Sequence, residues 1–427
     1  MTINKVRGTR DLIPIENYLS LYTFIRNHLK FNHYIEIHTP YIQYEELFTK
    51  NLGIATDIVN KEMYYISHIH QEETDPKIVL RPEITASIMR AYLEENIETS
   101  PWKVFEIGPA FRHERPQKGR YREFFQCSIE CIDAQSIGYD IELLFVLQSL
   151  FNSLIPNLFQ LEINYIGSTT ERNLYKEKLY DYCIANKDKF PLSVQNKLQL
   201  ESILRILDSK DQEIQKILNN APKISQFWND TSTKNWETIT SGLSTLKIPF
   251  IHNEKLIRGL DYYNGLIFEF VSNNLGAQNT FAGGGRYDDL ASNINPKINA
   301  PALGAGIGID RLLLIMDTLN KKIVNKDIKF VAIIIETTNF QLGIDYSLAI
   351  TKEFYNNGIK SKIYFDKISL KSGLKKANME DAYLACLITD FNIIHKKISI
   401  KEMHNEKKQI ELDYKDTLPY IIKKIKE

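Results

Sequence analysis

The segment FEIGPAFRHERPQKGRYREFFQ, residues 105–126, consists of two strand-like pieces on either side of a basic loop. The charged residues of this loop are Arg112, His113, Glu114, Arg115, Lys118, Arg120 and Arg122. Guanidinium groups bind phosphate oxygens with paired hydrogen bonds and stay charged when partly desolvated, so such a loop suits a triphosphate. A charged turn in solvent is the alternative, but Arg112 directly follows the apolar residues PAF and favours a ligand-binding hairpin.

The sequence around the hairpin predicts an antiparallel sheet with helices packed around it. Residues 16–31 repeat apolar side chains at helical spacing, and residues 34–42 alternate like a strand that runs into Pro40. Further extended segments follow, and their connections contain turns or helical sequence rather than regular crossover helices. Residues from about 168 to 248 have helical periodicity, which predicts a helical insertion. The predicted fold class is α+β.

The end of the chain predicts a second domain. Strands and helices alternate over residues 328–427, which is typical of an α/β domain with a largely parallel sheet. We place the linker near residues 320–328, so the first domain covers residues 1–320. From Lys321 to Glu427 there are 20 lysines, no arginine and 14 acidic residues, although the whole chain has a net charge of zero. This basic end fits phosphate contacts, and it equally fits a lysine-rich solvated surface.

Composition and cysteine usage narrow the class of protein. With 43% hydrophobic and 25% charged residues, the chain can build substantial cores. Its four cysteines form no CxxC pair, and no histidine lies near Cys127 and Cys131 to complete a zinc set, so we expect a reducing compartment and no metal site. No stretch reaches the roughly 18 consecutive apolar residues that span a bilayer. Because the N-terminus lacks signal-peptide and transit-peptide features, we expect a cytoplasmic location.

Three glycines alternate along PALGAGIGIDR, residues 301–311, which reads as a strand that turns into a helix. Gly304, Gly306 and Gly308 would clear space for a flat ligand against the backbone, and a stacked adenine is a natural candidate. Arg311 would then reach a phosphate or the plane of the base. The alternative is a plain core helix, since the residues after Arg311 are apolar.

Tyrosine and glycine dominate another pair of segments, LIRGLDYYNG at residues 256–265 and AGGGRYDDL at residues 282–290. Successive glycines let the backbone approach a ligand closely. Tyr262 and Tyr263 follow Arg258, and these side chains are candidates for ligand contacts. A tyrosine pair packed in the core, with its hydroxyl groups satisfied there, is the alternative.

The segment LRPEITASIMR, residues 80–90, contains Glu83 and Thr85 at the end of a strand and just before a helix. A carboxylate in this position can hold an ammonium group. It can equally stabilise the helix by lying at the positive end of the helix dipole. The residues alone leave both readings open.

Together these motifs resemble the class II aminoacyl-tRNA synthetases over almost the whole chain. The general motifs are matched by the helix and strand that end at Pro40, by FRHERPQKGRYREF and by GAGIGIDR. LIRGLDYYNG and AGGGRYDDL resemble the two histidine-specific motifs of the histidyl-tRNA synthetase family, and RPEIT resembles its RPEGT segment. The resemblance implies a class II catalytic domain with a helical insertion, followed by an α/β anticodon-binding domain.

The resemblance also implies the reaction and its participants. The chain would use ATP to convert L-histidine to histidyl-adenylate and would transfer the histidyl group to tRNA(His), releasing AMP and pyrophosphate. Magnesium ions are expected with ATP, although the sequence does not assign their ligands. A homodimer formed through the helix and strand before Pro40 is implied, as is an insertion that clamps the tRNA acceptor arm.

Site residues are implied position by position. The ATP phosphates would be bound by Arg112, Arg120 and Arg311, with Arg112 at the α-phosphate. The amino group of histidine would be held by Glu83, Thr85 and Gln126. The imidazole would face Glu130 and Tyr263, with Tyr262 and Tyr287 beside it. Arg258 would lie between the substrate carboxylate and the α-phosphate.

Elementary chemistry supports these roles. Attack of a carboxylate on an α-phosphate brings two anions together, so a fixed cation such as Arg258 lowers the repulsion. An imidazole needs an acceptor for its N–H and a polar partner for its other nitrogen, and Glu130 and Tyr263 supply both. A site that pairs buried polar groups with its substrate rejects isosteres strongly, which agrees with the lack of any apparent editing domain.

Some residues depart from the family pattern, and two rival readings remain. Ile84 stands where glycine is common, Asp310 replaces a frequent glutamate, and LITDFNII lacks the usual Gly-Asp/Glu pattern of the anticodon-binding domain. One rival is a class II synthetase for another amino acid, and Glu130 with Tyr263 argues against it, since a pocket for an apolar or anionic side chain would not want that carboxylate. The main rival is a catalytically silent paralogue that serves as a regulatory subunit of ATP phosphoribosyltransferase. That paralogue tends to lose the arginine motif and the last domain, whereas this chain has Arg258 and about 100 residues after the linker.

Overall fold

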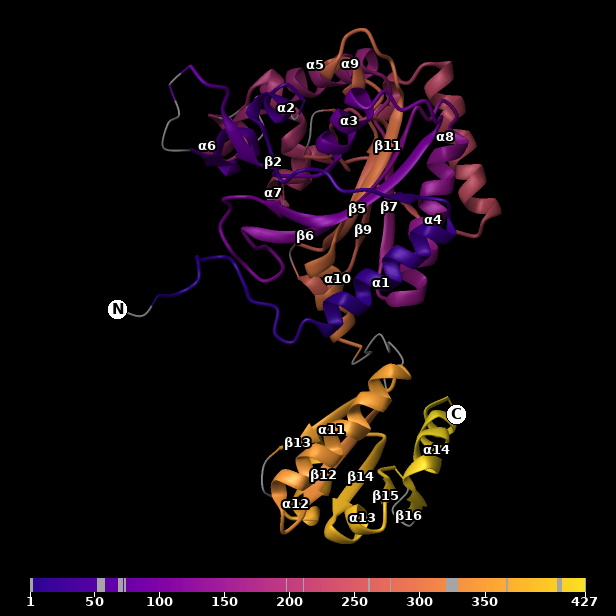
Figure 1. Cartoon of the computed structure of the whole chain (residues 1–427). Helices are drawn as coiled ribbons and strands as arrows, with labels where there is room; N and C mark the ends of the chain where they lie inside the picture. The colour runs from indigo at the N-terminus through magenta and orange to yellow at the C-terminus, as the bar shows by residue number, and fades with distance from the viewer. Residues whose placement is uncertain are drawn as a thin grey trace. The chain divides into compact units, whose positions relative to one another are not determined.

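The computed structural model describes residues 3–51, 58–67, 72, 74–196, 198–209, 211–259, 262–276, 278–319, 329–365, 368–404 and 409–426. The chain forms two compact units, Met1–Ile323 and Val324–Glu427 (Figure 1). The expected linker at residues 320–328 lies outside the described residues, so its conformation stays a prediction.

An eight-stranded sheet forms the centre of the first unit, with the strand order β1-β5-β6-β11-β10-β9-β7-β8. Its strands are β1 (Ile35–Glu36), β5 (Trp102–Phe111), β6 (Glu123–Ile132), β7 (Gln160–Tyr165), β8 (Ile251–His252), β9 (Asn264–Val271), β10 (Thr280–Arg286) and β11 (Ala302–Gly308). The five inner pairings are antiparallel, and only the edge pairs β1–β5 and β7–β8 are parallel. The α+β fold class with an antiparallel sheet is therefore confirmed.

The predicted hairpin is formed by β5 and β6, whose register pairs Gly108 with Gln126 and Phe111 with Glu123. The strand expected over residues 34–42 is wrong in its extent. It is divided between β1 and β2 (Ile42–Tyr44), and β2 belongs to a separate three-stranded sheet with β3 (Tyr64–Ile66) and β4 (Ile78–Leu80). The physical reason is that Pro40 has no N–H for a ladder and that the Thr39 N–H donates to the Glu106 carboxylate instead.

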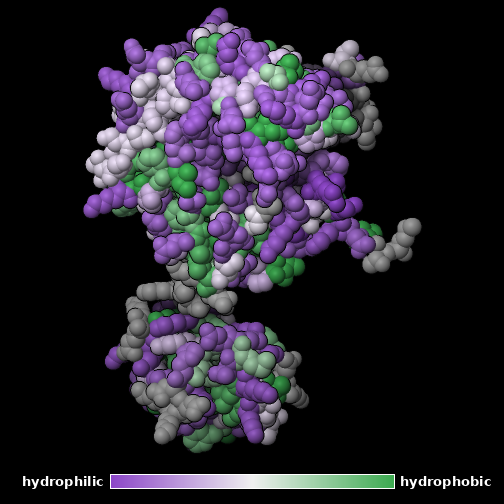
Figure 2. Space-filling model, turned by 180° about the vertical axis from the view of Figure 1, so that it is seen from behind, coloured by the Kyte–Doolittle hydropathy of each residue, from purple (hydrophilic) through white to green (hydrophobic). Residues whose placement is uncertain are grey.

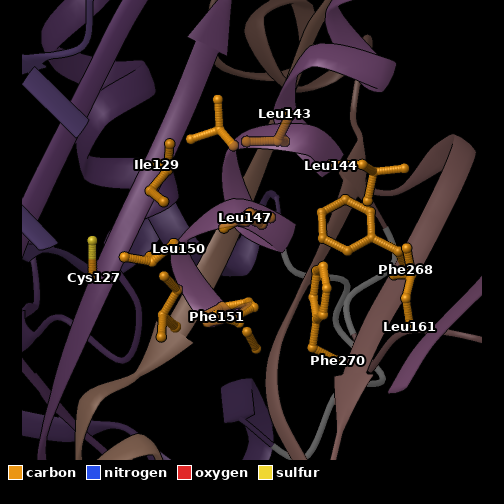
Figure 3. Close-up of a cluster of buried hydrophobic side chains, with 14 of the residues drawn as sticks. Cys127, Ile129, Leu143, Leu144, Leu147, Leu150, Phe151, Leu161, Phe268 and Phe270 are labelled. Carbon is orange, nitrogen blue, oxygen red and sulfur yellow. The ribbon is translucent and has the colours of Figure 1, made fainter. Parts of the chain in front are cut away.

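Helices α1 (Glu16–Phe31), α4 (Gly138–Leu154) and α10 (Ile309–Asp317) contribute to one apolar core against the large sheet. Figure 3 shows α4 laying its leucines and Phe151 against side chains of the strands. The rings of Phe151 and Phe270 meet edge to face, with centroids 4.8 Å apart. This packing holds in place the sheet whose strand β6 carries Gln126 and Glu130.

The predicted helical insertion is present between β7 and β8. Its α-helices are α5 (Thr169–Ala185), α6 (Leu192–Gln195), α7 (Gln212–Leu218) and α8 (Asp230–Thr245), with 3-10 turns at Lys187–Lys189, Leu200–Asp208 and Ile224–Phe227. A capping box of Ser168 and Glu171 begins α5. The Glu171 carboxylate also accepts hydrogen bonds from the Asn229 N–H and the Ser232 hydroxyl, so it joins the start of α5 to the start of α8.

Shorter elements complete the first unit. They are α2 (Glu45–Thr49), a π-helical turn at Ile58–Glu62, α3 (Thr85–Glu94), a 3-10 turn at Asn273–Leu275 and α9 (Leu290–Ile294). Helix α3 packs against α9. Its buried side chains belong to a second apolar cluster, which also includes side chains of the large sheet and of the insertion.

The second unit is a five-stranded sheet with the order β13-β12-β14-β15-β16. Its elements are β12 (Phe330–Glu336), α11 (Phe340–Asn356), β13 (Lys360–Tyr364), α12 (Leu370–Met379), β14 (Leu384–Thr389), α13 (Asp390–Ile394), β15 (Lys397–Glu402), β16 (Gln409–Asp413) and α14 (Tyr414–Lys426). The expected largely parallel sheet needs correction, because β14, β15 and β16 pair antiparallel. The connections before β15 and β16 are too short for full crossover helices.

Hydrophilic side chains cover most of the face shown in Figure 2, with hydrophobic ones in scattered patches. Among the described helices, none is long and apolar enough to cross a membrane.

Candidate active site

A cleft of about 340 Å³ opens between the β5–β6 hairpin, the start of α3 and the strands β9, β10 and β11. Nine of the predicted site residues line it, namely Glu83, Thr85, Arg112, Arg120, Gln126, Arg258, Tyr262, Tyr263 and Arg311. The two others, Glu130 and Tyr287, are buried in contact with the lining residues. Positions from five segments of the sequence therefore meet in one cleft.

Three guanidinium groups, those of Arg112, Arg120 and Arg311, form the basic side of the cleft. Arg112 donates from Nε to the Pro82 carbonyl at 2.9 Å. Arg311 donates from Nε to the Gly119 carbonyl at 3.1 Å. Burial lowers the pKa of Arg112 and of Arg311, and the positive charge of Arg120 lowers both further. An anionic ligand would relieve this crowding of positive charge.

The other charged residues of the basic loop are partly in solvent and partly buried, so the loop has features both of a ligand-binding hairpin and of a solvated turn. His113, Arg115 and Lys118 are exposed, as expected of a solvated turn. Glu114 is buried and accepts a hydrogen bond from Arg120 Nε at 2.7 Å. Burial raises the pKa of Glu114, although Arg120 and Arg112 oppose this.

Arg258 also lines the cleft and is paired with Glu269 of β9. Thr280 Oγ1 donates to the other oxygen of Glu269 at 2.7 Å. Burial would lower the pKa of Arg258, but the charge of Glu269 outweighs it and raises that pKa above its usual value. A Cβ added to Gly283 would lie 2.6 Å from the Arg258 guanidinium, so glycine leaves the space that this side chain occupies.

The sequence reasoning missed Glu269. It is the only acidic residue in the apolar strand NGLIFEFV, and that isolated charge was the available signal. Leu260 and Asp261 of the segment LIRGLDYYNG lie outside the described residues.

Glu83 shows the arrangement expected of a helix-stabilising carboxylate. Its oxygens accept the N–H groups of Thr85 at 2.6 Å and Ala86 at 2.9 Å in the first turn of α3. Glu83 also lines the cleft, so this role leaves it facing the ligand space. Burial raises the pKa of Glu83 in spite of these hydrogen bonds.

Glu130 is enclosed behind Thr85. The Thr85 hydroxyl donates to one carboxyl oxygen at 2.6 Å, and the Tyr287 hydroxyl donates to the other. Burial raises the pKa of Glu130 to about 8. The Tyr262 ring packs against Tyr263 and Tyr287, with centroid distances of 4.6 and 5.5 Å.

Gly304 corrects one expectation. A Cβ at this position would lie 1.7 Å from Glu130 Oε2, so the glycine makes room for a protein carboxyl group and not for a stacked base. Gly306 pairs with Ser128, and a Cβ there would lie 3.1 Å from Gln126 Nε2. Gly306 and Gly308 do line the cleft. The alternating glycines thus leave space for side chains of β6 as well as for the cleft.

The four cysteines are buried and unpaired. Burial raises the pKa of Cys183 to about 11. Within the described part of the chain, no three histidine, cysteine or acidic side chains come together in a way that could hold a metal ion.

Comparisons with known proteins agree with one another. A family model described as histidyl-tRNA synthetase matches residues 10–312. A histidine–tRNA ligase of Wolbachia pipientis (strain wPip) is 36% identical, covering 97% of this chain and 98% of that protein. One from Nitrosomonas europaea is 34% identical, covering 96% of both chains.

Solved structures show the same fold. The apo histidyl-tRNA synthetase of S. aureus aligns with a TM-score of 0.78 and 26% identity, covering 98% of this chain and 99% of that one. A protein from Bacillus halodurans titled ATP phosphoribosyltransferase regulatory subunit/histidyl-tRNA synthetase aligns with a TM-score of 0.58 at 18% identity, which shows the fold alone. Because a family model matches most of the chain and relatives above 30% identity match nearly all of it, the chain belongs to the histidyl-tRNA synthetase family.

Proposed function

We propose that the chain is a histidine–tRNA ligase. A carboxylate oxygen of histidine attacks the α-phosphorus of ATP, the bond to the β-phosphate breaks, and pyrophosphate leaves. A ribose hydroxyl at the end of tRNA(His) then attacks the activated carbonyl and releases AMP. The observation that carries this proposal is the single cleft in which four arginines meet Glu83 and Tyr263, in a chain with full-length relatives named histidine–tRNA ligase.

The proposed ATP site is the basic side of the cleft. Arg112 binds the α-phosphate, and Arg120 and Arg311 bind the outer phosphates, because these are the guanidinium groups whose mutual repulsion an anion would relieve. Magnesium arrives as part of the ATP substrate, and phosphate oxygens and water supply most of its ligands.

The proposed histidine site is the part of the cleft at the start of α3. Glu83, Thr85 and Gln126 hold the amino group, and Glu130 and Tyr263 recognise the imidazole, with Tyr262 and Tyr287 as its walls. This proposal is supported by burial, since a pocket whose polar groups are desolvated rejects a side chain that leaves them unpaired. Arg258 lies between the two anions that react and lowers their repulsion.

We further propose that the helical insertion at 168–248 contacts the acceptor arm and that residues 328–427 bind the anticodon. The support is general, since the second domain is lysine-rich and tRNA is a polyanion. We also propose a cytoplasmic location, in agreement with the cysteine usage.

A homodimer is proposed as well. Phe31 of α1 and Ile35 of β1 are 83% and 55% exposed, so the helix and strand before Pro40 carry apolar surface that a second copy would cover. Sedimentation showing only monomer at working concentration would contradict the dimer.

The experiment that tests the ligase proposal is acylation of tRNA(His) with labelled histidine by the purified chain. Acid-stable label on tRNA(His), but not on another tRNA, is the expected result. A folded chain that acylates nothing, yet activates an ATP phosphoribosyltransferase, would favour the regulatory-subunit alternative instead.

A further inference from the structure

The segment before α1 lies against the β5–β6 loop (Figure 1). We call residues 3–12 the N-terminal strap. It contains a turn in which the Thr9 N–H donates to the Val6 carbonyl at 3.0 Å, and the Gly8 carbonyl accepts the Arg122 N–H at 2.8 Å. The strap is thus hydrogen-bonded to the loop that carries Arg112 and Arg120.

Gly8 shows how closely the strap fits the loop. Its φ is +89°, a conformation that residues with a Cβ rarely adopt. An added Cβ would also lie 2.8 Å from Pro116 Cγ and 2.9 Å from Arg122 Cγ. Both the backbone conformation and the contact therefore require glycine here.

Arg10 connects the strap to a second part of the cleft. Its guanidinium group pairs with Asp310 Oδ1 and lies over the Tyr121 ring, 4.6 Å from the centroid. The other oxygen of Asp310 accepts the Phe125 N–H at 2.9 Å. Asp310 and Tyr121 both line the cleft, whereas Arg10 is not one of its lining residues.

These contacts join two phosphate-binding arms that are distant in sequence. Tyr121 belongs to the loop with Arg120, and Asp310 directly precedes Arg311 at the start of α10. The three arginines of the basic side repel one another, so ATP binding needs both arms held in place beforehand. A cation at Arg10 neutralises Asp310 and holds the Tyr121 ring with the same side chain.

We propose that Arg10 is a positioning residue for ATP, acting through Asp310 and Tyr121 without touching the nucleotide. This inference rests on the proposed ATP site. It predicts that loss of Arg10 weakens the use of ATP and leaves the use of histidine nearly unchanged, because the hydrogen bonds and the ion pair that join the strap to the cleft involve Arg122 and Asp310 and not the proposed histidine-binding residues.

The test is histidine-dependent exchange of pyrophosphate into ATP, with KM measured separately for ATP and for histidine. Arg10→Met keeps an apolar stem and should raise KM for ATP by about tenfold, the equivalent of 1.4 kcal/mol, with KM for histidine within about twofold. Arg10→Lys should recover part of the loss, since it restores the charge but not the flat group over Tyr121.

Lys5→Met is the matched control, because Lys5 is a strap cation whose partner, Asp11, is exposed. It should leave both KM values unchanged. Gly8→Ala disturbs only the contact of the strap with the β5–β6 loop, and it should raise KM for ATP as well. In the Arg10→Met/Asp310→Asn double variant, the two effects should be less than additive, since they remove one contact.

An unchanged KM for ATP in folded Arg10→Met would overturn the inference. So would equal increases of both KM values together with a lowered unfolding midpoint, which would mean a merely structural role. Absence of exchange in the unaltered chain would instead contradict the proposed function, so the two failures are distinguishable.

Discussion

Glu130 is a carboxyl group whose surroundings oppose its charge. It is 1% exposed, and its partners are two hydroxyl groups rather than a cation. Burial therefore raises its pKa to about 8, which lies above the value of about 4.3 expected in an unfolded chain. A substrate that brings a positive or proton-donating group would lower the cost of the ionised form.

This pKa predicts how stability depends on pH. Between about pH 4.3 and pH 8 the folded chain holds a proton on Glu130 that the unfolded chain releases, so the contribution of this group to stability falls as pH rises through that window. Glu130→Gln should remove this slope. Urea unfolding of both proteins from pH 5 to about pH 8.5 measures it. If the free energy of unfolding depended on pH in the same way in both proteins, Glu130 would be ionised over the whole pH range.

Arg258 gives a second prediction at this scale. Arg258→Ala should slow histidyl-adenylate formation by about a hundredfold to a thousandfold, because it removes a fixed cation from the reacting centre. The substitution also leaves Glu269 without its partner. Glu269→Gln and the double variant are therefore the controls, and single-turnover rates are the measurement. A normal rate for Arg258→Ala would rule out the proposed role.

The sequence predicted which residues line the cleft, whereas it did not predict how distant residues pair there. The position of Arg112 in the cleft was predictable, because an arginine that directly follows an apolar strand is placed to meet a ligand there. The Arg258–Glu269 pair and the enclosure of Glu130 by Thr85 and Tyr287 depend on strand order, and no local pattern reports that order.

At the scale of elements, periodicity predicted the hairpin, the helical insertion and the strand that turns into α10. It failed at residues 34–42, because apolar and polar residues alternate there without a break although the chain passes from the eight-stranded sheet to the three-stranded one. It also failed to show that β15 and β16 pair antiparallel, since an isolated strand has the same pattern in either sheet type.

The junction of α5 and α8 gives a prediction at this scale. Burial raises the pKa of Glu171, but hydrogen bonds from Ser168, Asn229 and Ser232 outweigh it and lower that pKa. Glu171→Ala should therefore lower the free energy of unfolding by about 3 kcal/mol near neutral pH.

The loss should shrink as acid protonates the native carboxylate, because a group with a lowered pKa contributes its full stability above the unfolded pKa and loses it as pH falls through the folded pKa. Chemical unfolding at two pH values measures this. Glu177→Ala, an exposed carboxylate on the same helix, is the control and should change little. Equal effects of the two substitutions would contradict the joining role of Glu171.

At the scale of the whole molecule, every residue assigned to activation belongs to the unit Met1–Ile323. The two units were predictable because a mostly antiparallel pattern gave way to alternating strands and helices. The second unit has apolar clusters of its own on the two faces of its sheet. Activation and tRNA selection should therefore be separable.

A chain that ends at residue 319 tests this separation. It should keep histidine-dependent pyrophosphate exchange within a few-fold, and its charging of tRNA(His) should fall by roughly tenfold or more, since each lost contact of 1.4 kcal/mol weakens binding tenfold. Circular dichroism checks that the truncated chain is folded. Undiminished charging would show that the second unit does not bind the anticodon.

The most direct test of histidine activation by this chain is pyrophosphate exchange into ATP by the intact chain, with each of the twenty amino acids supplied separately. We predict exchange with histidine alone, because an apolar side chain would bring no polar group to the buried Glu130 and Tyr263. Exchange with a different amino acid, or with none in a folded protein, would contradict it.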